Sequence, residues 1–207
     1  MRATRLFIAA GLGFSLLACG DVTSPITGGP DAAVAGVTPS LPVSEIRSAP
    51  PLDIRHGSWW AVQGKQTRFI ASFREAHKAK SLFLAFTIPS SAQLVAPGGR
   101  RLATGDSIRI TVDLVSKTLE AQLAPHGLTF ADGVPAQLAI SYAYADLRGL
   151  PATALAVWYQ PTTSEPWMKQ STAIDRDHKL ATTEISHFSQ YALRFDNYAV
   201  AYSAVAR

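Results

Sequence analysis

Residues 107–114 constrain the fold most, because their side chains alternate strictly between apolar and polar. Apolar side chains occupy every second position: Ile108, Ile110, Val112 and Leu114. Arg109, Thr111 and Asp113 lie between them. A period of two is typical of a β-strand with one face in the core and the other in solvent. The stretch therefore predicts a half-buried strand of an antiparallel sheet.

Short runs rich in β-branched and aromatic residues recur along most of the chain, with turn residues between them. They predict further strands at residues 67–74, 81–88, 118–124, 135–144, 153–160, 167–172 and 179–184. No stretch has the length and periodicity of a long helix. We therefore expect an all-β fold, an antiparallel β-sandwich of about eight or nine strands.

Residues 185–195 carry apolar side chains on both sides of a two-residue period. Ile185, Tyr191 and Phe195 share one side, whereas Phe188 lies on the other. This pattern predicts one strand buried inside the sandwich. The alternative is a bulge between Phe188 and Tyr191 that turns both rings inward.

The N-terminus has the order of a targeting segment. Arg2 and Arg5 precede an apolar run at residues 6–17 that is too short to span a bilayer. Residues 16–19, Leu-Leu-Ala-Cys, resemble the lipobox of bacterial lipoproteins. The resemblance implies cleavage after residue 18 and lipidation of Cys19, the only cysteine. The alternative is an ordinary signal peptide with an incidental cysteine.

The composition divides the rest of the chain into three parts. Residues 19–52 are rich in Pro, Gly, Ser and Ala, which predicts a disordered linker behind the lipidated cysteine. Residues 53–196 have the texture of a folded β domain, and residues 197–207 are expected to form a C-terminal tail or an edge strand. The expected location is the bacterial cell envelope, lipid-anchored and extracytoplasmic, on the periplasmic side or at the cell surface.

Charge and histidine placement argue against several classes of function. Removing Arg2 and Arg5 from 19 basic residues leaves 17 against 15 acidic ones, and no basic cluster is interleaved with aromatic residues. We therefore expect no nucleic-acid partner. The five histidines show no metal-ligand spacing, and no nucleotide or hydrolase fingerprint is present. We expect neither a metal nor a cofactor.

Several motifs occur in the order found in ZU-five domains, β-sandwich modules of netrin receptors, ankyrins and some death-domain adaptor proteins. They lie at residues 86–92, 107–113, 123–130, 134–140 and 157–159, and in His187-Phe-Ser-x-Tyr191. The chain resembles this family over residues 66–195, with the usual Pro-Val pair inverted at Val134-Pro135. The resemblance implies the same sandwich fold.

In several members of the family, the His-Phe-Ser motif is where the backbone cleaves itself. The resemblance implies that the Ser189 hydroxyl would attack the Phe188 carbonyl, with His187 accepting the proton. A period of two would put His187 and Ser189 on one side of a strand. The alternative, which we predict, is that Phe188 and Tyr191 are core rings and the motif serves packing alone.

These observations predict a membrane-tethered extracytoplasmic lipoprotein with a ZU-five-like structural or interaction module and no turnover activity. The membrane is the expected partner through the lipid on Cys19, beside a protein or glycan partner. Two alternatives remain open. One is an autoproteolytic domain that cleaves between Phe188 and Ser189. The other is a carbohydrate- or peptide-binding module that uses Trp59, Trp60 and an exposed sheet face.

Overall fold

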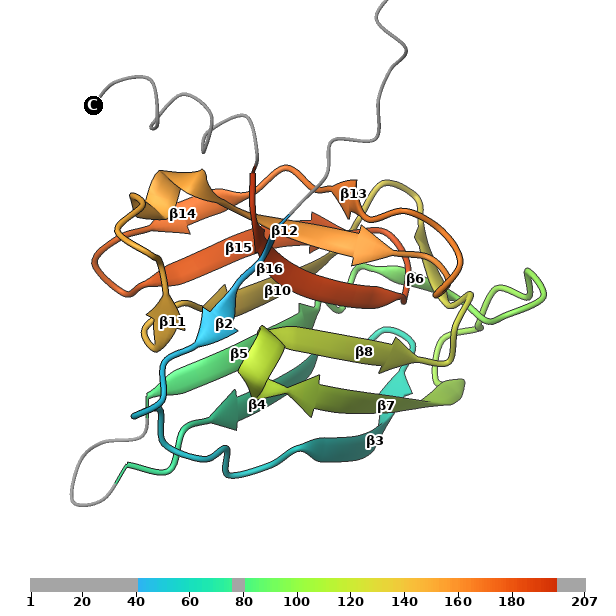
Figure 1. The fold of residues 1–207 in the computed structure, drawn as a ribbon. Helices are drawn as coiled ribbons and strands as arrows, with labels where there is room; N and C mark the ends of the chain where they lie inside the picture. The colour runs from blue at the N-terminus through green and yellow to red at the C-terminus, as the bar shows by residue number, and fades with distance from the viewer. Residues whose placement is uncertain (1–40, 76–80, 197–207) are drawn as a thin grey trace, which may run out of the picture. The chain divides into compact units, whose positions relative to one another are not determined.

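The computed structural model describes residues 41–75 and 81–196, and all its strand pairs are antiparallel. The larger sheet faces the viewer in Figure 1. Its strands, in spatial order, are β13 (Met168–Lys169), β12 (Leu155–Gln160), β16 (Gln190–Phe195), β8 (Glu120–Ala124), β7 (Ser107–Val115) and β3 (His56–Val62), and β1 (Leu41–Pro42) also pairs with β16.

A five-stranded sheet lies behind the first one. Its order is β14 (Ala173–Asp175), β15 (Leu180–Ile185), β10 (Ala136–Ser141), β5 (Leu82–Ile88) and β4 (Thr67–Ser72). Two small pairs complete the fold: β11 (Ala145–Asp146) with β2 (Ser44–Glu45), and β6 (Gln93–Val95) with β9 (Thr129–Ala131). The only helical turns in the described part are the 3-10 turns η1 (Ser116–Thr118) and η2 (Ala152–Ala154).

The predicted fold class is confirmed: the described part is an all-β, antiparallel sandwich with one apolar core between its sheets. The alternation of β7 is also confirmed. Ile110, Val112 and Leu114 are buried, whereas Arg109 and Asp113 are exposed. No helix among residues 41–75 and 81–196 is long and apolar enough to cross a membrane.

Residues 185–195 do not form the single strand that their pattern predicts. β15 ends at Ile185 in the five-stranded sheet, and β16 begins at Gln190 in the seven-stranded sheet. Residues 186–189 cross from one sheet to the other. Ser186 is exposed and His187 half-buried, but the second half of the crossing turns inward, so the successive side chains of Phe188 and Ser189 are both buried. The two-sided apolar pattern reflects this passage and not a central strand or a bulge.

The expected linker boundary at residue 52 is wrong for its last twelve residues. Leu41 pairs with Phe195, and β2 pairs with β11. Val43 is fully buried, and Leu52 is buried opposite Phe73. Two buried apolar side chains and two short strand pairs thus dock a Pro-rich segment whose average composition is that of a linker. Residues 19–40 and the expected tail at residues 197–207 lie outside the described residues.

The edge strands β3 and β4 meet through an aromatic stack. The rings of Trp59 and Phe69 are nearly parallel, with centroids 4.7 Å apart. Gly57 allows this approach, since a Cβ at that position would lie 2.6 Å from Cε2 of Phe69. The stack closes one open edge of the sandwich, between β3 and β4.

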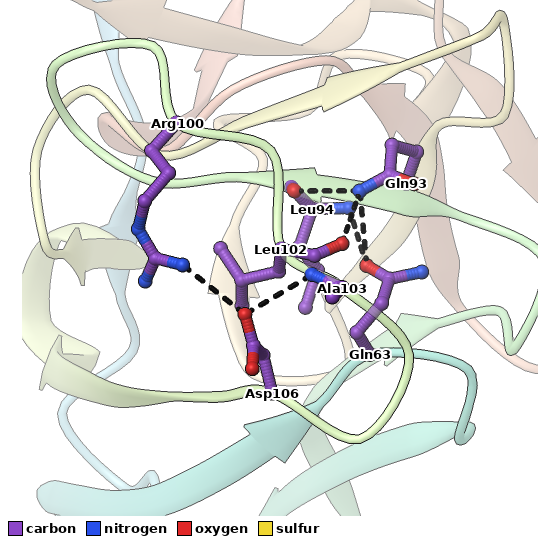
Figure 2. Close-up of polar contacts among 7 residues, drawn as sticks. All are labelled: Gln63, Gln93, Leu94, Arg100, Leu102, Ala103 and Asp106. Carbon is purple, nitrogen blue, oxygen red and sulfur yellow. Dashed lines mark hydrogen bonds and ion pairs between the residues drawn. The ribbon is translucent and has the colours of Figure 1, made fainter.

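The side-chain amides of buried Gln63 and half-buried Gln93 hold the long connection between β6 and β7 in place, as Figure 2 shows. Gln63 accepts the backbone N–H of Leu94 at 2.8 Å, and the Gln93 amide donates to the Leu102 carbonyl at 2.9 Å. At the far end of the loop, one Asp106 oxygen accepts from Ala103 N and from the Arg100 guanidinium, each at 3.1 Å. The loop is therefore part of the scaffold at this end of the sandwich.

Candidate functional site

The crossing at residues 186–189, which holds the His-Phe-Ser motif, is tied to the sandwich through its backbone. Phe188 N donates to the Leu128 carbonyl at 2.8 Å, and Phe130 N donates to the Ser186 carbonyl at 2.8 Å. Leu123 N donates to the Ser189 carbonyl at 3.0 Å. Strand β9 and the turn that precedes it therefore position the motif from one side.

The Phe188 side chain fills the space between the sheets. Its ring meets Phe86 and Phe130 edge to face, with centroid distances of 5.6 and 5.8 Å. This is a favourable geometry for aromatic pairs. Phe188 is 3% exposed and Tyr191 1%, so the predicted burial of both rings is confirmed.

The Ser189 hydroxyl already has a hydrogen-bond acceptor. Its Oγ donates to the backbone carbonyl of Gln160, the last residue of β12, at 2.6 Å. The side chain is buried, and it ties the end of the crossing to the neighbouring strand. A nucleophile whose hydrogen points at a carbonyl oxygen must break this bond before a base can take its proton.

His187 belongs to an aromatic cluster and does not bind the serine. Its ring lies 4.9 Å from the ring of Tyr159 and 6.4 Å from that of Tyr191, measured between centroids. The Tyr191 hydroxyl donates to the His187 carbonyl at 2.6 Å. Burial first, and then nearby Tyr159, raises the pKa of Tyr191, so its hydroxyl stays a donor. In the described part of the chain, no hydrogen bond joins the His187 and Ser189 side chains.

Self-cleavage also needs a strained backbone at the bond that breaks. Among residues 41–75 and 81–196, the non-glycine residues with a left-handed φ are Leu119, Asp132, Arg148 and Lys179. His187, Phe188 and Ser189 are not among them. The structure thus contains the two side chains that the self-cleavage alternative needs, but it does not join them and has no left-handed backbone at the bond.

Trp59 and Trp60 do not form one surface. Trp59 points inward onto Phe69, while Trp60 is 63% exposed on the outer face of the seven-stranded sheet. The register pairs Trp60 with Arg109, whose Nε donates to the Ser58 hydroxyl at 2.8 Å. The alternation of residues 107–114 already places Arg109 on the solvent face, but no motif marks it as a partner of Trp60.

A cavity of about 450 Å³ lies beside η1, and no sequence motif points to it, because one wall comes from the segment expected to be a linker. Glu45, Arg55 and Lys117 bring charge to it. One carboxylate oxygen of Glu45 is buried without a hydrogen-bond partner in the described part. Burial raises the pKa of Glu45, while the Ser116 hydroxyl and the two cations act in the opposite direction.

Two further expectations concern metals and the lipid anchor. Within the described ranges, no group of three or more His, Cys, Asp or Glu residues is arranged to hold a metal ion. Cys19, the expected lipidation site, lies outside the described residues.

Comparisons with known proteins identify no relative of this chain. No protein-family model, no curated protein and no solved structure matches the chain. The resemblance to ZU-five domains therefore depends on the motifs in the sequence alone.

Proposed function

We propose that this chain is a lipid-anchored protein of a bacterial cell envelope, with a ZU-five-like β-sandwich that acts as a structural or interaction module. The observation that carries the proposal is the order of the N-terminus: two arginines, a short apolar run, and Leu-Leu-Ala-Cys ending at Cys19. In this proposal the lipid on Cys19 holds the protein at the membrane, and the sandwich meets a partner there.

The way the chain enters the sandwich supports a tethered module. The first described residue, Leu41, pairs with Phe195 at the end of β16. The opposite end of β16, at Gln190, lies beside Gln160 of β12. A tether that precedes residue 41 would thus join the sandwich at one end of its strands and leave the other end free for a partner.

The hydrogen bonds of the His-Phe-Ser motif support a role without turnover. The Ser189 hydroxyl and the Tyr191 hydroxyl both donate to backbone carbonyls, those of Gln160 and His187. Each bond ties neighbouring parts of the fold together. We therefore propose that the motif packs the crossing between the sheets and that the Phe188–Ser189 bond stays intact.

Lipidation is tested by expressing the chain in a bacterial host with a fatty acid that can be tagged. Wild type should carry the label and fractionate with membranes. Cys19→Ser should carry no label and should appear either uncleaved or in the soluble fraction. Ser24→Ala, a hydroxyl change just beyond the lipobox, is the matched control and should behave like wild type. Labelled Cys19→Ser that is processed like wild type would overturn the proposal.

A further inference from the structure

We propose that the outer face of β3 and β7, around Trp60 and Arg109, binds an acidic glycan whose sugar rings carry carboxylates. The inference rests on the proposed function as an interaction module and names the ligand class that this module takes. It follows from three features of the face: which side chains point outward, how isolated the exposed ring is, and how the charges are paired.

The alternation of β3 sorts its side chains onto two faces. Gly57 and Ala61 are buried, and Trp59 faces the core, whereas the outward positions His56, Ser58 and Trp60 are exposed. The register places Trp60 opposite Arg109 and Ser58 opposite Thr111. Side chains directly opposite each other in an antiparallel pair have Cβ atoms about 4.5–5.5 Å apart. An indole ring, a guanidinium and two hydroxyls thus share one small area.

Trp60 is the most exposed of the large apolar side chains in the described part, and its cross-strand neighbours on this face are polar. The exposed large apolar residue of β7, Val115, is six residues from Arg109, which corresponds to about 20 Å along a strand. A protein interface usually has a core of several apolar residues. A single flat ring among hydroxyls and charges suits a sugar ring, which offers one C–H face and a rim of hydroxyl groups.

On the outer face of β3 and β7, Arg109 is a cation with no carboxylate partner among the described residues. Asp113 is engaged by His56, with Nδ1 2.6 Å from Oδ1. Arg109 donates from Nε to Ser58, and no carboxylate pairs with it in the described part of the chain. The bond to Ser58 uses only Nε, so the two terminal nitrogens of the guanidinium can donate to both oxygens of a carboxylate. An unpaired guanidinium beside an open indole ring favours a sugar that carries a carboxylate over a neutral one.

The test measures binding of the detergent-purified full chain to three polymers at about 0.15 M salt, where weak exposed charge contacts are screened. Polygalacturonate is the acidic glycan, its carboxyl-reduced form is the neutral match, and polyglutamate carries carboxylates without sugar rings. We expect binding to polygalacturonate at least tenfold tighter than to either control. Trp60→Ala should weaken that binding at least tenfold, and Trp60→Phe should retain most of it.

Arg109→Gln should abolish the preference for polygalacturonate over its carboxyl-reduced form. Arg68→Gln, which removes an exposed arginine from β4 of the other sheet, is the matched control and should keep the preference. Circular dichroism confirms that each variant is folded. Three outcomes would each overturn the inference: no binding to polygalacturonate, equal binding to polyglutamate, or binding that Trp60→Ala leaves unchanged. The assay reads binding whether or not Cys19 carries lipid, so its failure is distinct from failure of the anchoring proposal.

Discussion

Phe188 lies where the chain passes between the two sheets, in contact with Phe86 of β5 and Phe130 of β9. Replacing it with alanine removes a ring that the surrounding strands cannot collapse to fill. Phe188→Ala should therefore lower the free energy of unfolding by about 3–5 kcal/mol, measured by chemical denaturation. Phe188→Leu, which keeps most of the volume, should cost markedly less. A loss below about 1 kcal/mol for the alanine variant, typical of surface positions, would contradict its place in the core.

The burial of a single residue can follow from the sequence, whereas its contacts with distant residues do not. The burial of Phe188 could be predicted, because a large aromatic residue within the apolar stretch 185–195 favours the core. The bond from Ser189 to Gln160 could not, since the two residues are 29 apart in the chain and meet only when β12 pairs with β16. Trp59 and Trp60 are adjacent in sequence, and only the register of β3 with β7 decides which of them faces water.

The segment that carries β1 and β2 yields a prediction about stability. A chain that begins at residue 53 loses the pairing of Leu41 with Phe195 and the buried side chains of Val43 and Leu52. Each such side chain is worth about 1.5–3 kcal/mol of burial, partly offset by the ordering of the segment. The shortened chain should melt at least about 4 °C below a chain that begins at residue 41.

Thermal unfolding followed by circular dichroism measures this difference, and the chain that begins at residue 41 is its matched control. In the full chain, Val43→Ala should reproduce part of the loss, whereas Ser44→Ala at its half-buried neighbour should not. Equal melting temperatures for the two shortened chains would mean that residues 41–52 add nothing to the stability of the sandwich.

Periodicity located most strands but could not assign them to sheets. Residues 153–160 and 179–184 are close to the observed β12 and β15, because each has a clear run between turn residues. Residues 185–195 combine the end of β15, the crossing and β16, and nothing in a two-residue period marks a change of sheet. In the same way, β13 and β14 belong to different sheets, although only residues 170–172 separate them.

For the whole molecule, the composition and the spacing of strands were enough to predict an antiparallel sandwich, because few other folds accommodate many short strands without a long helix. Less of the candidate site could be predicted from the sequence. A motif names side chains, whereas chemistry depends on which atoms they meet. The structure turns the Ser189 hydroxyl toward Gln160 and the His187 ring toward Tyr159. Likewise, the pairing of Arg109 with Trp60 exists only once β3 and β7 are in register.

The integrity of the chain is the last prediction. Attack on the Phe188 carbonyl requires a free Ser189 hydroxyl, a base within hydrogen-bond reach and a strained peptide. In the structure the hydroxyl donates to Gln160, and His187 packs against Tyr159. Denaturing mass spectrometry of the purified protein should therefore show one species, with no fragment beginning at Ser189, at neutral and mildly alkaline pH.

Two variants make this measurement decisive. Ser189→Ala removes the nucleophile, and Thr183→Ala removes a comparable buried hydroxyl, one that donates to the Ser171 carbonyl at 2.7 Å. Both should give the same single-species spectrum as wild type. A fragment of residues 189–207 that appears in wild type and Thr183→Ala but is absent from Ser189→Ala would show that the motif cuts its own backbone. Because both variants lose a buried hydroxyl, that difference would reflect the chemistry of Ser189 and not a general weakening of the fold.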